Sequence, residues 1–143
     1  MDAFDADALI YAAIRNHPLG RRVRAVLPVH AVEPGGTAQA VGSVLLIPEV
    51  LSKSLRETAE AATSELRTLL SRLDLLPVDE ATAEFAAELG ASYRLRAADA
   101  VHLATAVRSG ADRFLTNNRS DFPKSISEID VTYPDELPDP RGG

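Results

Sequence analysis

Hydrophobic positions in this chain fall into short continuous runs, separated by longer segments in which apolar residues recur every three or four positions. The clearest continuous run is VGSVLLI at 41–47, and shorter strand-length segments lie at 2–4, 75–78, 113–116 and 126–131. Continuous apolar runs are typical of strands that are buried on both faces of a parallel sheet. We therefore expect five strands, with the last one at an edge of the sheet.

The segments between these strands have the periodicity of helices that bury one face. Pro18 and Pro48 each suit the first turn of a helix, where a backbone N–H has no partner to lose. The expected helices cover 8–14, 18–25, a stretch from Pro48, 58–73, a stretch from Asp79 or Thr82 to about Gly90, and the segment after Asp99. Strands that alternate with helices predict an α/β fold, a three-layer α/β/α sandwich with a mainly parallel central sheet.

The pattern predicts one domain followed by a short tail. Residues 1–133 form the domain, and 134–143, with three prolines, two terminal glycines and several acids, is expected to be loose. The apolar stripe of the helix at 58–73 suits either the core or the surface of a homodimer.

The rest of the chain is organised around 95–122. Asp99 lies where a helix is expected to begin, and the residues that follow are apolar on all sides, which predicts a buried helix. Gly110 fits the position just past its end. A short strand then ends at Thr116 and leads into the polar loop NNRSD at 117–121.

Acidic and amide side chains follow several of the predicted strands, and the carboxyl ends of parallel strands meet at one edge of a sheet. Crowded carboxylates repel one another, and a bound cation is the usual resolution. All-oxygen ligands favour Mg²⁺ or Mn²⁺ over Zn²⁺, and such a site suits hydrolysis of phosphodiester bonds. The candidates are Asp5, Glu49, Asp99, Thr116, Asn118 and Asp121. The alternative is that each acid only caps a helix in a plain α/β domain.

His102 follows Asp99 by three positions but lies inside an apolar run. We interpret it as a core histidine, or one that supports the site from behind, rather than as a catalytic base.

Composition and charge narrow the classes of protein. The 143 residues include no cysteine, which excludes disulfides and thiolate metal sites. No apolar run approaches about 20 residues and the first residues are acidic, so we expect no membrane span or signal peptide and a cytoplasmic location. The net charge of −6 argues against a general nucleic-acid coat protein but not against a nuclease with an acidic metal site. Four arginines between Arg15 and Arg24, with Lys53 and Arg56, fit either a phosphate-contacting patch or a solvated surface.

Four segments resemble the motif regions of PIN-domain ribonucleases, most closely the VapC-like toxins of toxin–antitoxin pairs. They are FDADALIYA, LLIPEVL, AADAVHLATAV and ADRFLTNNRSDF, and the resemblance covers nearly all of the chain from Asp2 to about Val131. It implies a Mg²⁺- or Mn²⁺-dependent endoribonuclease that acts on RNA, is silenced by a small antitoxin and forms a homodimer.

The resemblance also assigns roles to residues. Asp5, Glu49 and Asp99 match the family's metal-site acids, and Thr116 would orient the cluster by hydrogen bonding. Asn118 stands where the family commonly has an aspartate, so either Asp121 substitutes for that acid or the Asn118 amide oxygen contacts the metal or its water. Asp7 stands where a small hydroxyl residue is common, and would either add a carboxylate or cap the first helix.

Two alternatives stay open at this point. A catalytically weakened PIN domain would bind RNA or protein without cutting, and Asn118 with the acidic net charge favours it. The Asp5-Ala6-Asp7 sequence also copies the opening of haloacid dehalogenase-type phosphatases. That class needs an activating lysine, and neither Lys53 nor Lys124 is well placed for the task.

Overall fold

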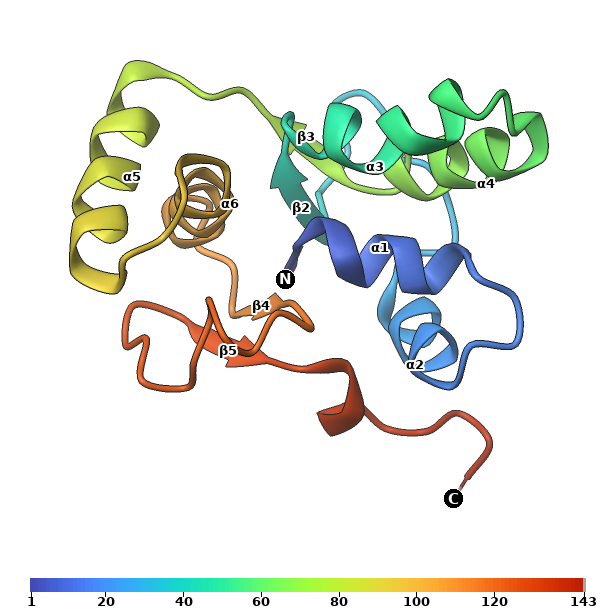
Figure 1. Ribbon diagram of the computed structural model, residues 1–143. Helices are drawn as coiled ribbons and strands as arrows, with labels where there is room; N and C mark the ends of the chain where they lie inside the picture. Colours follow the sequence, from blue (N-terminus) through green and yellow to red (C-terminus); the bar gives the residue numbers. More distant parts are fainter. Residues whose placement is uncertain (143) are drawn as a thin grey trace.

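The computed structural model describes residues 1–142 and contains one five-stranded sheet (Figure 1). Its strands are β1 (Asp2–Phe4), β2 (Ala40–Ser43), β3 (Asp74–Leu76), β4 (Arg113–Leu115) and β5 (Asp130–Thr132). Their order across the sheet is β3-β2-β1-β4-β5, and every neighbouring pair is parallel. The predicted parallel sheet, with its last strand at an edge, is therefore confirmed.

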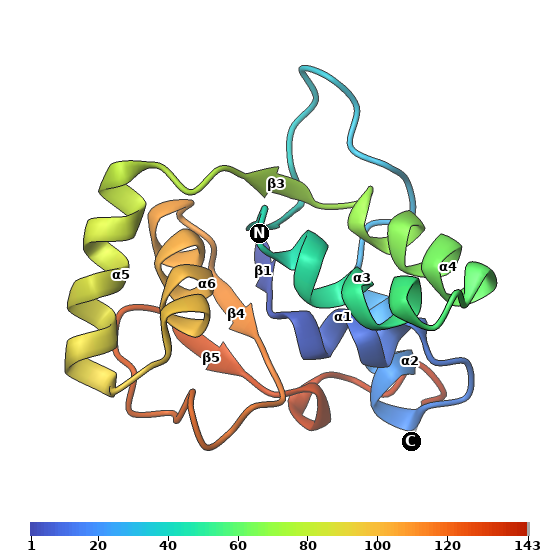
Figure 2. The same ribbon diagram turned by 45° about the horizontal axis from the view of Figure 1, so that its top comes forward.

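Helices cover both faces of the sheet, which confirms the three-layer sandwich. The helices are α1 (Ala6–Ala13), α2 (Pro18–Val26), α3 (Leu46–Arg56), α4 (Glu60–Leu70), α5 (Glu80–Tyr93) and α6 (Ala97–Arg108). Figures 1 and 2 show α5 and α6 together on one side and the other four helices on the opposite side. Each helical layer buries its apolar face against the sheet, and this produces two separate cores.

Strand side chains alternate between these two cores, as the pleat of a strand requires. Phe4 and Leu115 pack with α1 to α4, whereas Ala3 and Phe114 pack with α5 and α6. All four are almost fully buried. Burial on both faces explains why the strands read as continuous apolar runs rather than as alternating ones.

The register of the central strands sets the position of the site. β1 pairs with β4 so that Phe4 lies opposite Leu115. The next residues along the two strands are Asp5 and Thr116, which therefore lie side by side at the carboxyl edge although 111 positions separate them.

The run at 41–47 was predicted as one strand, and this was wrong in its second half. β2 ends at Ser43, and Leu46 already belongs to α3. Leu46 is buried because it folds back against Gly42, where an added Cβ would lie only 2.3 Å from its Cδ1 atom. Burial makes this helix start look like a strand, because both conformations fill the position with an apolar side chain.

Three helix boundaries also differ from the prediction. The helix expected over 58–73 begins at Glu60, because Thr58 has a φ of 49° and interrupts the chain between α3 and α4. α5 runs through Gly90 to Tyr93 and ends at Arg94, with a φ of 56°. α6 begins at Ala97, so Asp99 lies in its first turn and does not cap it.

The segment expected to be a loose tail from Pro134 starts with ordered structure. Residues Pro134–Glu136 form a 3₁₀ helix, and Leu137 is buried in the core beside α2. Arg22 on α2 donates from Nη1 to the carbonyl oxygens of Asp135 and Leu137, at 2.9 Å in each case. The expectation also included Gly143, which lies outside the described residues. Within residues 1–142, no helix is long and apolar enough to span a membrane.

Candidate active site

Asp5 is held at the end of β1 by backbone and side-chain bonds. Its backbone N–H donates to the carbonyl of Leu115 at 2.9 Å, and its carboxylate caps α1 by accepting from the N–H of Ala6 at 2.9 Å. The side chain is buried, and this burial raises the pKa of Asp5, although its hydrogen bonds and the nearby His102 oppose the rise. Asp5 is therefore a carboxylate kept away from water at a fixed position.

Thr116 fixes the second oxygen of that carboxylate. It is fully buried, and its hydroxyl donates to Oδ2 of Asp5 at 2.7 Å. The same hydroxyl oxygen accepts from the backbone N–H of Asn118 at 3.1 Å. Thr116 thus links the Asp5 carboxylate to the loop after β4.

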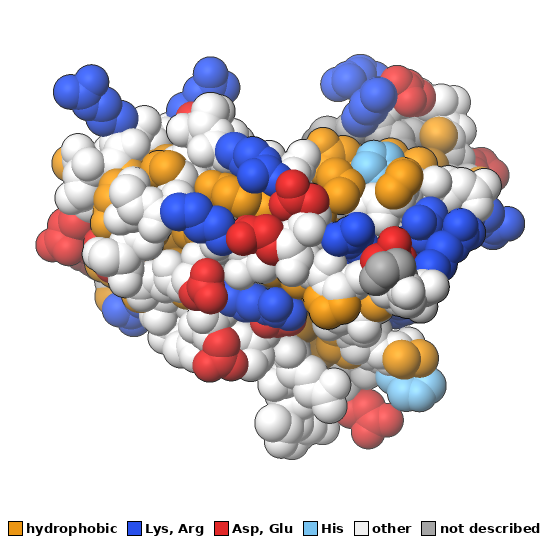
Figure 3. Space-filling view, turned by 90° about the horizontal axis from the view of Figure 1, so that it is seen from below, with side chains coloured by type: hydrophobic (Ala, Val, Ile, Leu, Met, Phe, Trp, Pro, Cys, Tyr) orange, Lys and Arg blue, Asp and Glu red, His pale blue; other side chains and the backbone are white. Residues whose placement is uncertain are grey.

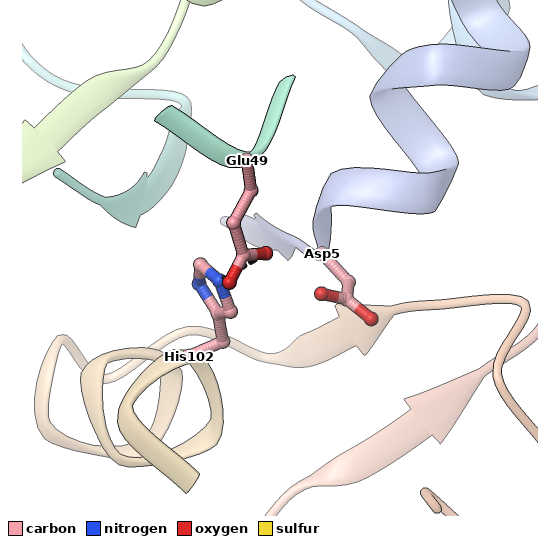
Figure 4. A group of neighbouring side chains, drawn as sticks. All are labelled: Asp5, Glu49 and His102. Atoms are coloured by element: carbon pink, nitrogen blue, oxygen red, sulfur yellow. Dashed lines mark hydrogen bonds and ion pairs between the residues drawn. The ribbon is translucent and has the colours of Figure 1, made fainter. Parts of the chain in front are cut away.

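Glu49 reaches the same place from the first turn of α3 and meets His102 from α6 (Figure 4). The His102 Nε2 atom lies 3.0 Å from Oε2 of Glu49. The two side chains differ in environment, because His102 is completely buried while the Glu49 side chain is 33% exposed. The pair thus connects the buried interior beside α6 to the solvent-accessible carboxyl edge of the sheet.

Asp5, Glu49 and His102 form a cluster that we call the central triad. One potential ligand atom from each of the three lies within 4.8 Å of the others. Two ligand atoms bound at ~2.1 Å in an octahedral shell are about 3–4.2 Å apart. The upper limit for the triad is slightly wider than this range, and its two carboxylates, of Asp5 and Glu49, offer the oxygen donors that Mg²⁺ and Mn²⁺ prefer. The sequence predicts His102 as a core or supporting residue. Its spacing of three residues from Asp99 places both on one helix face, and this is the sequence feature that links it to the site.

Asp99 lies close enough to the triad for electrostatic interaction with its charged groups. Its half-buried position raises the pKa of its carboxyl, and the negative charges of Asp5, Asp121 and Glu49 raise it further. The predicted acids at four separate chain positions thus share one electrostatic environment. Without a cation, these carboxylates destabilise one another.

The loop after β4 uses its own polar groups internally. The Asn118 Nδ2 atom donates to Oδ2 of Asp121 at 2.9 Å. Its amide oxygen accepts from the Ser120 hydroxyl at 3.1 Å and from the Asp121 backbone N–H at 3.2 Å. Both ends of the Asn118 amide are therefore occupied, whereas the Asp121 carboxylate has a remaining oxygen.

Asp7 does not cap α1, because Asp5 occupies that position. Instead it accepts the backbone N–H of Asn117 at 3.0 Å, and so connects α1 to the loop after β4. Burial and the negative charge of Asp5 raise the pKa of Asp7 to about 7. Asp7 is a further carboxylate at the same edge of the sheet.

The arginine cluster at 15–24 is partly structural. Arg22 holds the C-terminal segment, and Arg24 donates to the carbonyls of Ala12 and Ile14 at the end of α1. In contrast, Arg15, Lys53 and Arg56 are exposed and form no ion pair within residues 1–142. Lys and Arg side chains are interspersed with acids on the face in Figure 3 and gather most densely on its right-hand side.

Comparisons with known proteins agree with this arrangement. The family model described as PIN domain matches residues 3–124. Over 72 residues the chain is 42% identical to ribonuclease VapC46 of Mycobacterium tuberculosis, an alignment that covers 50% of this chain and 54% of that protein. The match therefore spans about half the length of this relative.

Two solved structures have a similar fold. A toxin–antitoxin complex from Klebsiella pneumoniae aligns with a TM-score of 0.70 and 24% identity, over 94% of this chain and 98% of that chain. VapBC2 from Rickettsia felis, solved with a DNA fragment from its promoter, aligns with a TM-score of 0.67 and 16% identity, over 92% and 97% of the respective chains.

Proposed function

Because the chain belongs to the PIN-domain family, we propose that it is a Mg²⁺- or Mn²⁺-dependent endoribonuclease and the toxin of a toxin–antitoxin pair. The observation that carries this proposal is the convergence of Asp5, at the end of β1, and Glu49, on α3, to within 4.8 Å of each other. The identity to a ribonuclease over half the chain supports the choice of RNA as substrate.

The residues of the site have distinct tasks in this proposal. Asp5, Glu49 and Asp99 bind the ion, with Asp121 as the acid of the last motif, and Thr116 orients Asp5. A bound divalent ion supplies a hydroxide near neutral pH and offsets charge on the scissile phosphate. The carboxylates hold it at the edge of the sheet, and the chain has no cysteine that would act as a nucleophile in its place.

Three exposed cations, on α3 and after α1, are available for the RNA backbone. Lys53 and Arg56 lie on α3, the helix that carries Glu49, and Arg15 follows the end of α1. Because no ion pair occupies these side chains within residues 1–142, we assign them to phosphate contacts. A cytoplasmic location, where cellular RNA would be the substrate, is part of the proposal.

An apolar groove beside Glu49 supports an antitoxin partner. It has a volume of about 300 Å³ and lies between α1, α3 and α4. Ile10 and Ile14 on its wall are 37% and 46% exposed, and Lys53 and Glu57 also line it. A small antitoxin would cover these isoleucines with an apolar segment and reach the acidic site with a basic side chain.

The homodimer implied by the resemblance belongs to the proposal as well. The apolar stripe of α4 does not provide its surface, because Leu66, Leu69 and Leu70 are buried in the core. A dimer therefore needs another face of the molecule.

One observation favours a weakened PIN domain as the second candidate. Asn118 stands where a carboxylate is common, and its amide is bound within the loop. The site then has one negative charge fewer for a second ion. The haloacid dehalogenase alternative is set aside by the family membership, and Lys124 is bound to the Val131 carbonyl and to Glu136.

The proposal is tested by incubating the purified, partner-free chain with total cellular RNA and Mg²⁺ or Mn²⁺. We expect cleavage that a chelator abolishes and that Asp5→Asn and Asp99→Asn each remove. Asp130→Asn, an exposed change at the opposite end of β5, is the matched control and should cut normally. Cleavage that persists in the Asp5 and Asp99 variants would contradict the proposal. No cleavage by a folded wild-type chain that still binds RNA would favour the weakened domain.

A further inference from the structure

His102 occupies an unusual position for a histidine in a helix core. Its side chain has no exposed surface, and one ring nitrogen, Nδ1, is buried with no hydrogen-bond partner within residues 1–142. Among the residues that the structure describes, the ring has one polar contact, between Nε2 and Oε2 of Glu49 at 3.0 Å. An apolar residue would fill this space without leaving a buried nitrogen unpaired. The contact to Glu49 is therefore the feature that distinguishes His102 from a packing residue.

The chemistry of the pair fixes which atom carries the hydrogen. A carboxylate only accepts hydrogen bonds, so the ring nitrogen that faces Glu49 must donate. With its hydrogen pointed at Oε2, Nε2 has no lone pair to offer a metal ion. Ligation by this nitrogen would break the bond to Glu49 and move the hydrogen to Nδ1, where it would be buried without an acceptor.

On these grounds we propose that His102 is a positioning residue that aims the Glu49 carboxylate at the metal and does not itself bind the metal. The inference rests on the proposed metal-dependent function. Glu49 is one-third exposed and has a long flexible side chain, whereas Asp5 is fixed by Thr116 and its own backbone. The hydrogen bond from His102 holds Oε2 of Glu49 and leaves Oε1 free for the ion. It also reduces the side-chain conformational entropy that Glu49 would otherwise lose when the ion binds.

Direct titration of the RNA-free chain with Mn²⁺, by calorimetry, measures this role without any turnover. Removing a hydrogen-bond partner of a metal ligand typically weakens metal binding about 10- to 100-fold. We expect that loss for His102→Leu, which fills the cavity but cannot donate. His102→Gln keeps a donor near the same place and should restore most of the affinity.

A double-mutant cycle separates positioning from packing. In a Glu49→Gln background, His102→Leu should cause no further loss of Mn²⁺ affinity, because the carboxylate that it orients is already gone. Equal losses in both backgrounds would show that His102 acts through general packing and would overturn the inference.

A measurement on the unaltered chain covers the case in which the His102 variants fail to fold. Long-range ¹⁵N NMR of the ring, recorded with diamagnetic Mg²⁺ bound, reports which nitrogen carries the hydrogen. A hydrogen that stays on Nε2 supports positioning, and its loss from Nε2 on Mg²⁺ addition identifies a ligand and overturns it. If the proposed metal-dependent function is itself wrong, the result is different, because the wild-type chain would then bind neither Mn²⁺ nor Mg²⁺.

Discussion

Asn118 and Asp121 are joined by a hydrogen bond of 2.9 Å from the amide Nδ2 to the carboxylate Oδ2. The amide donor stabilises the negative charge of Asp121, so this carboxylate depends less on a cation than an unpaired carboxylate would. It also means that the residue standing in place of a carboxylate is engaged with the nearest acid in the same loop. The Asn118 substitution and Asp121 therefore have to be considered as a unit.

Asn118→Asp should destabilise the metal-free chain, because it replaces a donor with a second carboxylate at that distance. We expect a loss of about 1–2 kcal/mol in the free energy of unfolding. Mn²⁺ should raise the free energy of unfolding more in this variant than in the wild type, since the new acid adds a ligand. Urea unfolding with EDTA or Mn²⁺ measures both effects. The exchange variant Asn118→Asp/Asp121→Asn restores a donor–acceptor pair and serves as the control, and an equally unstable exchange variant would refute the explanation.

Thr116→Val should remove the hydroxyl that orients Asp5 while keeping the shape of the buried side chain. A buried acceptor that loses its donor costs roughly 1–3 kcal/mol, and Mn²⁺ affinity should fall as Asp5 becomes free to rotate. Thr116→Ser retains the hydroxyl and should preserve the affinity. If the valine and serine variants bind Mn²⁺ equally well, the hydrogen bond has no orienting role.

Asp7→Asn should stabilise the metal-free chain at pH 8 and much less at pH 4. Burial raises the folded-state pKa of Asp7 to about 7, from an ordinary value of 3.8, so as the pH falls the native state takes up a proton before the unfolded state does. The contribution of Asp7 to the free energy of unfolding is therefore most favourable below pH 3.8 and is lost as the pH rises through 7. The amide has no charge to lose, and we expect a gain on the order of 2 kcal/mol at pH 8. Unfolding midpoints in EDTA from pH 4 to 8 test this, and a pH-independent gain would contradict it.

Added Mg²⁺ or Mn²⁺ should raise the melting temperature more at pH 8 than at pH 5.5. The pKa values of Asp5, Asp7 and Asp99 are all raised, so protons compete with the ion for the same carboxylates as pH falls. Thermal unfolding with and without the ion gives the comparison. In Asp5→Asn the increase at pH 8 should shrink sharply, whereas Asp130→Asn should respond like the wild type.

Arg22→Ala should loosen the C-terminal segment and leave the sheet intact. Two carbonyl oxygens, of Asp135 and Leu137, lose their donor, and Leu137 loses the contact that keeps it against α2. We expect a loss of about 1–2 kcal/mol and faster proteolysis after residue 133. Arg22→Lys, with a single charged group, should be intermediate. Unchanged proteolysis of the alanine variant would show that Leu137 alone anchors the segment.

The sequence predicted the sheet, and with it the edge at which Asp5 and Thr116 lie, for a simple physical reason. Parallel strands bring their carboxyl ends together, so Asp5 and Thr116 are placed as soon as β1 and β4 are recognised. The end of β2 was harder to predict, because Leu46 is buried whether it lies in a strand or in a helix. Contacts between side chains from distant segments, such as His102 with Glu49 or Arg22 with the carbonyl of Leu137, depend on how the layers pack. No local pattern contains that information.

The pairing of β1 with β4 has a consequence for the synthesis of the protein. β1 lies at the centre of the sheet, and its partner β4 follows more than a hundred residues later in the chain. Until β4 has been synthesised, Asp5 has neither Thr116 to orient it nor Asp121 in the loop that follows. A chain that has not yet reached β4 therefore lacks the hydrogen bond that orients Asp5, so the proposed centre forms only after β4 has been synthesised.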